Sequence, residues 1–220
     1  MKKILALMIA VLMLATLVAC GGPVETTGNE ETDAPETDAP ETDAPETDAP
    51  ETDAPAVETP AIDSALALIE TVWATYGDDE KFAAAGGYGE NMNWEGPGYI
   101  PSNDEEALLA AQTYFVLSDE AIAMVEGDMG MLMHAMNANT FTAGSFKLKA
   151  DATAESFAAS VKDTVTNNRW MCGFPEKLVI ISVGDYVVSA FGNGELIANF
   201  TAKVQAAFEN ATILAEEALA

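Results

Sequence analysis

Five consecutive copies of Glu-Thr-Asp-Ala-Pro occupy residues 31–55 and limit how this chain can fold. Residues 21–60 contain 13 acidic residues and no lysine or arginine. Because this segment has little apolar surface to bury, it cannot offset the entropy lost on ordering. Each proline removes an N–H donor and favours extended geometry in the residue before it. We therefore predict a disordered acidic tether over residues 20–60, with a reach of about 120 Å, and a folded core confined to residues 61–220.

The repeat has a period of five residues, which is too short for a solenoid. Carboxylates in a disordered chain bind cations diffusely and do not form a cage. A spacer is therefore the preferred interpretation of the repeat over a specific calcium-binding or partner-binding tail.

The N-terminus carries a second distinct segment. Lys2 and Lys3 precede an almost wholly apolar stretch over residues 4–17, and the small residues that follow end at Cys20. The apolar stretch is shorter than the ~20 residues needed to cross a bilayer as a helix. This pattern is typical of a secretory signal.

The sequence Leu17-Val18-Ala19-Cys20 resembles the lipobox of bacterial lipoproteins. The resemblance implies that residues 1–19 are removed as a signal peptide and that the Cys20 thiol receives a diacylglycerol. Two or three acyl chains would anchor the mature protein stably on the extracytoplasmic side of the cell membrane, in a Gram-positive bacterium. The alternative is an ordinary signal peptide with a chance cysteine.

Residues 61–220 are numerous enough for one domain with its own core. They contain 23 acidic and 7 basic residues, a net charge of −16. Nucleic acid is excluded as a partner because its binding requires a basic surface, and docking on anionic lipid headgroups is disfavoured. Cationic partners remain open beside a simple role in solubility. With Cys20 acylated, Cys172 has no partner for an intrachain disulfide.

The first half of the domain is only partly assignable. Apolar residues at helical spacing predict an amphipathic helix over residues 63–76. Residues 77–103 are rich in Gly, Asn and Pro, and scattered aromatic residues predict an ordered loop packed by those rings. A second helix is expected from residue 102 to about residue 114. Residues 119–138 are ambiguous, and within them residues 121–126 fit a strand or a helix start.

The second half has a clearer pattern. We expect a strand over 141–149 and then a helix capped by Asp151. Two strands over 178–183 and 186–191 are expected to form a hairpin joined by Gly184-Asp185. A helix starting near Asn193 and a short strand over 211–214 are expected to follow. The hairpin register places Val183 opposite Tyr186. One side of the hairpin is wholly apolar, so we expect helices to cover it and leave the other side more open.

The order β-α-β-β-α-β from about residue 140 is the ferredoxin-like pattern. We therefore predict an α+β fold with an antiparallel sheet and helices on one face, preceded by an N-terminal helical section. That pattern hosts many unrelated activities and names no chemistry.

Three stretches in the domain are distinctive, and they begin at His134, Trp170 and Val183. They read His-Ala-Met-Asn-Ala-Asn-Thr-Phe-Thr, Trp-Met-Cys-Gly-Phe-Pro-Glu-Lys-Leu and Val-Gly-Asp-Tyr-Val-Val-Ser-Ala-Phe. Over about 100 residues the chain resembles a group of uncharacterised lipoproteins from clostridia-type Gram-positive bacteria that carry a domain of unknown function. The resemblance implies membership of that group, and it does not indicate any particular activity.

Two groups of residues are candidates for chemistry. Soft thioethers with an imidazole suit Cu(I), and such residues crowd together as Met129, Met131, Met133, His134 and Met136. The same methionines also serve a hydrophobic core, which is the preferred interpretation. As the only histidine, His134 excludes a zinc site built from several histidines, and we expect it near a helix end with its hydrogen bonds satisfied.

Cys172 precedes Gly-Phe-Pro, which is similar to the Cys-Gly-Phe-Ser of monothiol glutaredoxins. A reactive thiolate needs a lowered pKa, usually at a helix N-terminus, whereas Cys172 is expected to follow a helix C-terminus, whose partial negative charge disfavours a thiolate. We therefore expect a buried structural cysteine in a turn. Pairing of Cys172 with His134 as nucleophile and base has no support from their spacing.

No hydrolase, nucleotide-binding or EF-hand motif occurs in the chain. The preferred function is a non-catalytic, lipid-anchored module on an acidic stalk, without a cofactor, that binds an extracytoplasmic protein, a wall component or a small ligand. The alternatives are a thiol- or carboxylate-dependent enzyme and a Cu(I)-binding protein.

Overall fold

The computed structural model describes residues 62–219, and the predictions for the signal segment, Cys20 and the acidic repeat lie outside these residues. Within this range the α-helices are α1 (Ala65–Ala74), α2 (Glu105–Phe115), α3 (Asp119–Ala123), α4 (Ala154–Thr166) and α5 (Gly194–Ala207). The strands are β1 (Ala84–Ala85), β2 (Gly98–Ile100), β3 (Met129–His134), β4 (Phe141–Lys147), β5 (Lys177–Val183), β6 (Tyr186–Gly192) and β7 (Thr212–Ala218). Short 3-10 helices form η1 (Gly89–Asn91) and η2 (Ala138–Thr140). None of the helices in residues 62–219 has the length and apolar character needed to cross a membrane.

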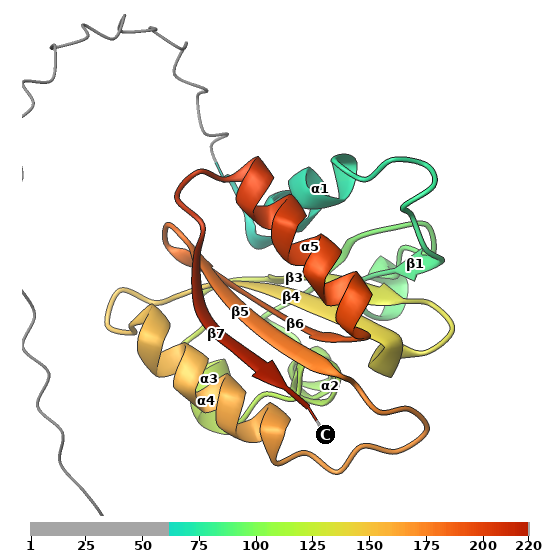
Figure 1. Cartoon of the computed structure of the whole chain (residues 1–220). Helices are drawn as coiled ribbons and strands as arrows, with labels where there is room; N and C mark the ends of the chain where they lie inside the picture. Colours follow the sequence, from blue (N-terminus) through green and yellow to red (C-terminus); the bar gives the residue numbers. More distant parts are fainter. Residues whose placement is uncertain (1–61, 220) are drawn as a thin grey trace, which may run out of the picture. The chain divides into compact units, whose positions relative to one another are not determined.

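The strands form one antiparallel sheet in the order β1-β3-β4-β6-β5-β7, with β2 also paired to β3 (Figure 1). The α+β class and the antiparallel sheet are therefore confirmed. The last strand is longer than the predicted segment 211–214 because pairing with β5 continues to Ala218.

The β5–β6 hairpin has the predicted register. Val183 lies opposite Tyr186, and Ile181 lies opposite Val188. Gly184 in the two-residue turn has a φ of 58°, a left-handed conformation that glycine adopts without a Cβ clash. The turn residues and the alternating pattern thus specify the same pairing.

Helices cover both faces of the sheet, so the predicted arrangement with helices on one face and an open second face is wrong. Helices α1 and α5 lie on one side, and α2, α3 and α4 lie on the other (Figure 1). The mixed side of the hairpin is also largely buried, since Leu178, Ile180 and Val187 are 0% exposed.

The handedness of strand crossovers explains this arrangement. Helix α4 connects β4 to β5 across β6, and α5 connects β6 to β7 across β5, so both connections step in the same direction along the sheet. Because β4 and β6 are antiparallel, right-handed crossovers place the two helices on opposite faces. A return of β7 to the outer side of β4 would have kept them on one face, but β3 already pairs there.

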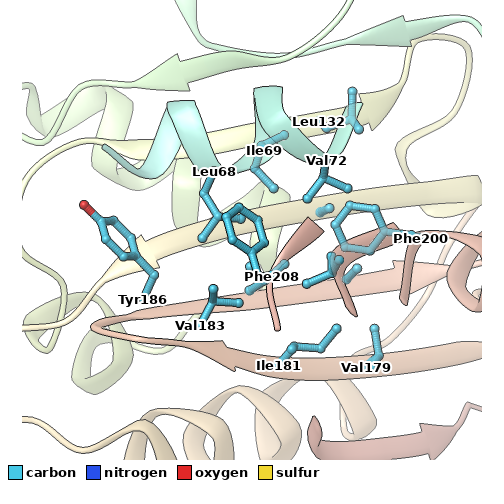
Figure 2. Packing of buried hydrophobic residues seen from close by; sticks show 14 of the residues in the cluster. Leu68, Ile69, Val72, Leu132, Val179, Ile181, Val183, Tyr186, Phe200 and Phe208 are labelled. Carbon is cyan, nitrogen blue, oxygen red and sulfur yellow. The ribbon is translucent and has the colours of Figure 1, made fainter. Parts of the chain in front are cut away.

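The core on the α1 and α5 side is built from the inward stripes of both helices. Leu68, Ile69 and Val72 of α1 lie above the strands, and Phe200 of α5 packs against them from the side (Figure 2). Strand residues at every second position complete this core, among them Val179, Ile181 and Val183. Ser64 caps α1 by accepting a hydrogen bond from the Ala67 N–H, which confirms the helix predicted over 63–76.

The core on the other side combines aromatic rings with the methionines of β3. Phe146 of β4 contacts Phe115 of α2 and Phe157 of α4, with ring centroids 5.1 Å apart in both pairs. Helix α4 forms as predicted and buries Phe157, Val161 and Val165, although Thr153 caps it in place of Asp151.

The region 77–103 contains more regular structure than the predicted loop, because β1 and β2 pair with β3. Gly86 and Gly98 face each other there, and a Cβ on either would collide with the backbone of the other. Phe82 packs against Trp73 and Phe141, whereas Trp94 is 67% exposed. The aromatic residues therefore pack this segment only in part.

Candidate functional site

The methionines for which core packing was preferred over a soft-metal site lie on β3 or just beyond it. Side chains alternate between faces along a strand, so Met129, Met131 and Met133 all point into the core beside α2 and α4, where none is more than 8% exposed. Met136 lies beyond the strand and is 83% exposed. The five Cu(I) candidates are therefore not gathered at one point, and the three buried thioethers act as core packing.

The same alternation places His134 on the opposite face from these methionines. Its ring stacks on Phe82 with centroids 5.7 Å apart and planes 12° apart, and its Nδ1 accepts a hydrogen bond of 3.2 Å from the Met136 N–H. The prediction of a satisfied histidine near a helix end is corrected in one respect, since His134 ends strand β3. Among residues 62–219, no group of three or more His, Cys, Asp or Glu side chains converges on a metal-sized site.

Cys172 is exposed, so the prediction of a buried cysteine is wrong. The reason lies two residues earlier, where Trp170 packs on Phe191 with ring centroids 5.0 Å apart and supplies the core contact of this loop. Cys172 has a φ of 62°, a left-handed conformation that is unusual outside glycine. Such strained residues persist where surrounding contacts hold them, and they cluster at functional sites.

Two amide side chains provide those contacts. The Asn137 Nδ2 donates to the Cys172 carbonyl at 2.9 Å, and the Asn139 Nδ2 donates to the carbonyls of Met171 at 2.9 Å and Gly173 at 3.2 Å. These bonds join the loop after β3 to the loop between α4 and β5, which are 32 to 35 residues apart in sequence. The backbone of both loops is thereby fixed at one end of the sheet.

The joined loops carry an exposed apolar surface, which we call the loop surface and define as Met136, Met171, Cys172 and Phe174. Met136 is 83% exposed, Met171 75% and Phe174 73%. Large apolar side chains exposed on adjoining loops are typical of interaction sites. The stretches that begin at His134 and Trp170 run through these two loops. Asn137 and Asn139 were missed at the level of sequence, because asparagine is also an ordinary turn residue.

A second feature is a pair of adjoining cavities of about 350 and 420 Å³, of which the first lies at the N-terminal end of α1. Glu126, Lys147 and Tyr186 line both cavities, and the Lys147 Nζ lies 3.5 Å from the Glu126 Oε1. Burial raises the pKa of Tyr186, Lys147 opposes the rise, and the carboxylates of Asp185, Asp63 and Glu126 add to it. The buried Tyr186 ring points its hydroxyl away from the core (Figure 2).

Two hydroxyl groups at the first of these cavities are engaged in hydrogen bonds within the domain. Ser64 lines the first cavity, but its hydroxyl is engaged as the α1 cap at 3.0 Å from the Ala67 nitrogen. The Tyr186 hydroxyl donates a long hydrogen bond of 3.5 Å to the Ile62 carbonyl. Neither Cys172 nor His134 lines this pair of cavities, so the predicted nucleophile candidates are not brought to it.

Comparison with known proteins finds no matching family model, no matching curated protein and no matching solved structure.

Proposed function

We propose that this protein is a lipid-anchored, extracytoplasmic binding module without catalytic activity, which holds one α+β domain away from the membrane on an acidic tether. The observation that carries the proposal is the loop surface. Three large apolar side chains stand exposed in two loops whose backbone is fixed by the amides of Asn137 and Asn139.

The rigidity of the loop surface favours binding. A surface already held in its bound conformation loses less entropy when a partner docks. Methionine side chains adapt their shape to a partner, and phenylalanine adds a large apolar contact. The loop surface therefore has both a fixed backbone and adaptable side chains.

The anchoring part of the proposal rests on the N-terminal sequence. Lys2, Lys3 and the apolar stretch 4–17 match a secretory signal, and Leu17–Cys20 matches a lipobox. An extended tether with a reach of about 120 Å would carry the loop surface beyond the lipid headgroups.

The partner in this proposal is an extracytoplasmic protein. The net charge of −16 over residues 61–220 opposes contact with anionic lipid or nucleic acid. A protein surface with apolar side chains and no excess of carboxylates fits the loop surface. The element order first read as ferredoxin-like adds nothing to the choice, because a fold of that kind serves many functions.

The test is chemical crosslinking on intact host cells that carry the full chain, followed by recovery with an antibody to the chain. A variant with Met136→Gln, Met171→Gln and Phe174→Gln is expected to lose a crosslinked partner because its apolar contacts are removed. Leu109→Gln is the matched control, since Leu109 is 65% exposed on α2, outside the loop surface. Crosslinks that are the same for the wild type and the triple variant would contradict the proposal.

A further inference from the structure

The outer edge of β7 is an unusually open end of the sheet. β7 is the last strand in the sheet order and pairs on one side with β5 over Thr212 to Ala218. No strand in residues 62–219 pairs with its other side. In an antiparallel ladder, alternate residues bond to each neighbour, so half of the β7 backbone groups point away from the sheet. Unpaired edges of this kind are templates for another strand.

The opposite end of the sheet shows how an edge is normally closed. There β3 is covered by the short strands β1 and β2, of two and three residues. β7 has seven residues, no proline and no lysine, so its glutamates and the β-bulge at Leu214 are the only devices within the strand that oppose strand addition. The outer edge of β7 is therefore unpaired, whereas the outer edge of β3 is covered by two short strands.

A groove runs between β7 and α4, with a volume of about 460 Å³. Its apolar lining comes from Leu214 and Ala215 of β7 and from Ala158 and Ala159 of α4. A β-bulge opposite Ile180 and Ile181 brings both Leu214 and Ala215 toward α4. The alanines leave room for side chains of moderate size, and the helix beside the strand edge forms the second wall (Figure 1).

The charge along this groove is negative. Glu155 lines it and takes part in no salt bridge within residues 62–219. Glu217 pairs with Lys162 of α4, and Glu216 pairs with Lys177 of β5. The whole of residues 61–220 has a net charge of −16. An occupant that carries basic side chains is therefore favoured over a neutral or acidic one.

We propose that the β7 edge and its groove bind an extended, basic segment of another polypeptide, which adds to the sheet as an eighth strand. Main-chain hydrogen bonds to β7 would supply the affinity, and alternate side chains entering the groove would supply the specificity. This goes beyond the partner binding proposed for the loop surface and rests on different residues.

Two other occupants fit less well. The chain's own repeat has a proline at every fifth position and two carboxylates in each copy, so it lacks an amide donor at each proline and is repelled by the acidic groove. A second copy of the domain would bring two bodies of net charge −16 together, which costs free energy through like-charge repulsion.

The experiment selects displayed random peptides of about ten residues, long enough to pair with the whole of β7, on the full chain held in detergent micelles. Selected peptides are expected to be basic with alternating apolar residues. Synthetic copies are expected to slow hydrogen exchange of the β7 amides and to bind more weakly as salt rises, because salt screens charge attraction. Peptides that are acidic, or that leave β7 exchange unchanged, would overturn the proposal.

A pair of matched variants tests the groove itself. Ala159→Trp places a large ring in the groove from an exposed position on α4, and it is expected to weaken peptide binding by about tenfold or more because the ring takes the space of the peptide side chains. Ala202→Trp makes the same change at an exposed position on α5, on the other face of the sheet, and is expected to leave affinity unchanged. The triple variant of the loop surface is expected to bind the peptides normally.

Equal peptide binding by the Ala159→Trp and Ala202→Trp variants would count against the β7 proposal. So would a dimer that Ala159→Trp dissociates. The third contrary result is peptide binding that is lost only in the triple variant of the loop surface. The dimer would assign the edge to a second copy. Loss of partner crosslinks in the loop-surface variant, with normal peptide binding, would leave the two proposals standing separately.

Discussion

At the scale of single residues, Tyr76 stands out because its ring is buried while its hydroxyl has no hydrogen-bond partner among residues 62–219. A buried hydroxyl without a partner loses its bonds to water and gains none in return. Tyr76→Phe removes that oxygen and keeps the ring, which packs on Trp73 with centroids 4.9 Å apart. We expect the free energy of unfolding at neutral pH to rise by about 1 kcal/mol, measured by urea denaturation with an unchanged m-value.

The same residue predicts how stability depends on alkaline pH. Burial raises the pKa of Tyr76, and the carboxylate of Glu80 adds to the rise. The unfolded chain releases the phenolic proton near pH 10, while the folded protein retains it, so the unfolded state binds fewer protons and stability falls as pH rises above about 10. Tyr76→Phe should reduce this fall. Tyr114→Phe, at a half-buried position on α2, is the control and should leave this fall in stability unchanged. The account would be contradicted if stability fell with pH as steeply in the Tyr76→Phe variant as in the wild type.

Single residues also mark where sequence reasoning reached its limit. The alternation of Met129, Met131 and Met133 was visible in the sequence, and once β3 forms it places all three in the core. The exposure of Cys172 was not visible, because it depends on Trp170 taking the core contact of the same loop. Tertiary packing decides which of two nearby apolar residues in a loop is buried. A loop has no regular alternation of buried and exposed positions from which this could be predicted.

At the scale of elements, the start of α5 shows how capping specifies a helix. Asn193 accepts hydrogen bonds from the N–H groups of Glu195 and Leu196, and the Glu176 carboxylate accepts one of 2.8 Å from the Gly194 N–H. Asn193→Ala leaves the first two donors without a protein acceptor. We expect it to cost about 1 kcal/mol of stability, as is typical of lost N-caps.

Asn193→Ser is the matched variant, because serine retains a side-chain oxygen at the cap. It should lose less than half of what alanine loses in the same urea titration. Equal losses in the two variants would show that the cap oxygen is not what stabilises the start of α5.

Elements were predicted better than their arrangement. The β5–β6 hairpin followed from a two-residue turn between alternating runs, and its register was confirmed. The sheet order did not follow, because it depends on β3, a strand in the segment 119–138 that the sequence left ambiguous. With β3 on the outer side of β4, the last strand joins β5 and α5 moves to the second face.

At the scale of the whole molecule, burial of both sheet faces leaves the two proposed binding surfaces at the margins of the domain. One margin is the pair of loops that carries Met136, Met171 and Phe174, and the other is the free edge of β7. Composition predicted a strongly acidic domain and the exclusion of nucleic acid as a partner. It could not predict these margins, because both arise where segments distant in sequence meet.

The central claim is that this domain acts outside the cell membrane while attached to lipid through Cys20. Mass spectrometry of the N-terminal peptide from protein made in its native host tests it most directly. The account predicts a first residue Cys20 that carries a diacylglycerol thioether, with residues 1–19 absent, and it predicts that Cys20→Ala releases the protein from the membrane fraction. An N-terminal peptide that retains residues 1–19, or a mature Cys20 without lipid, would contradict the account.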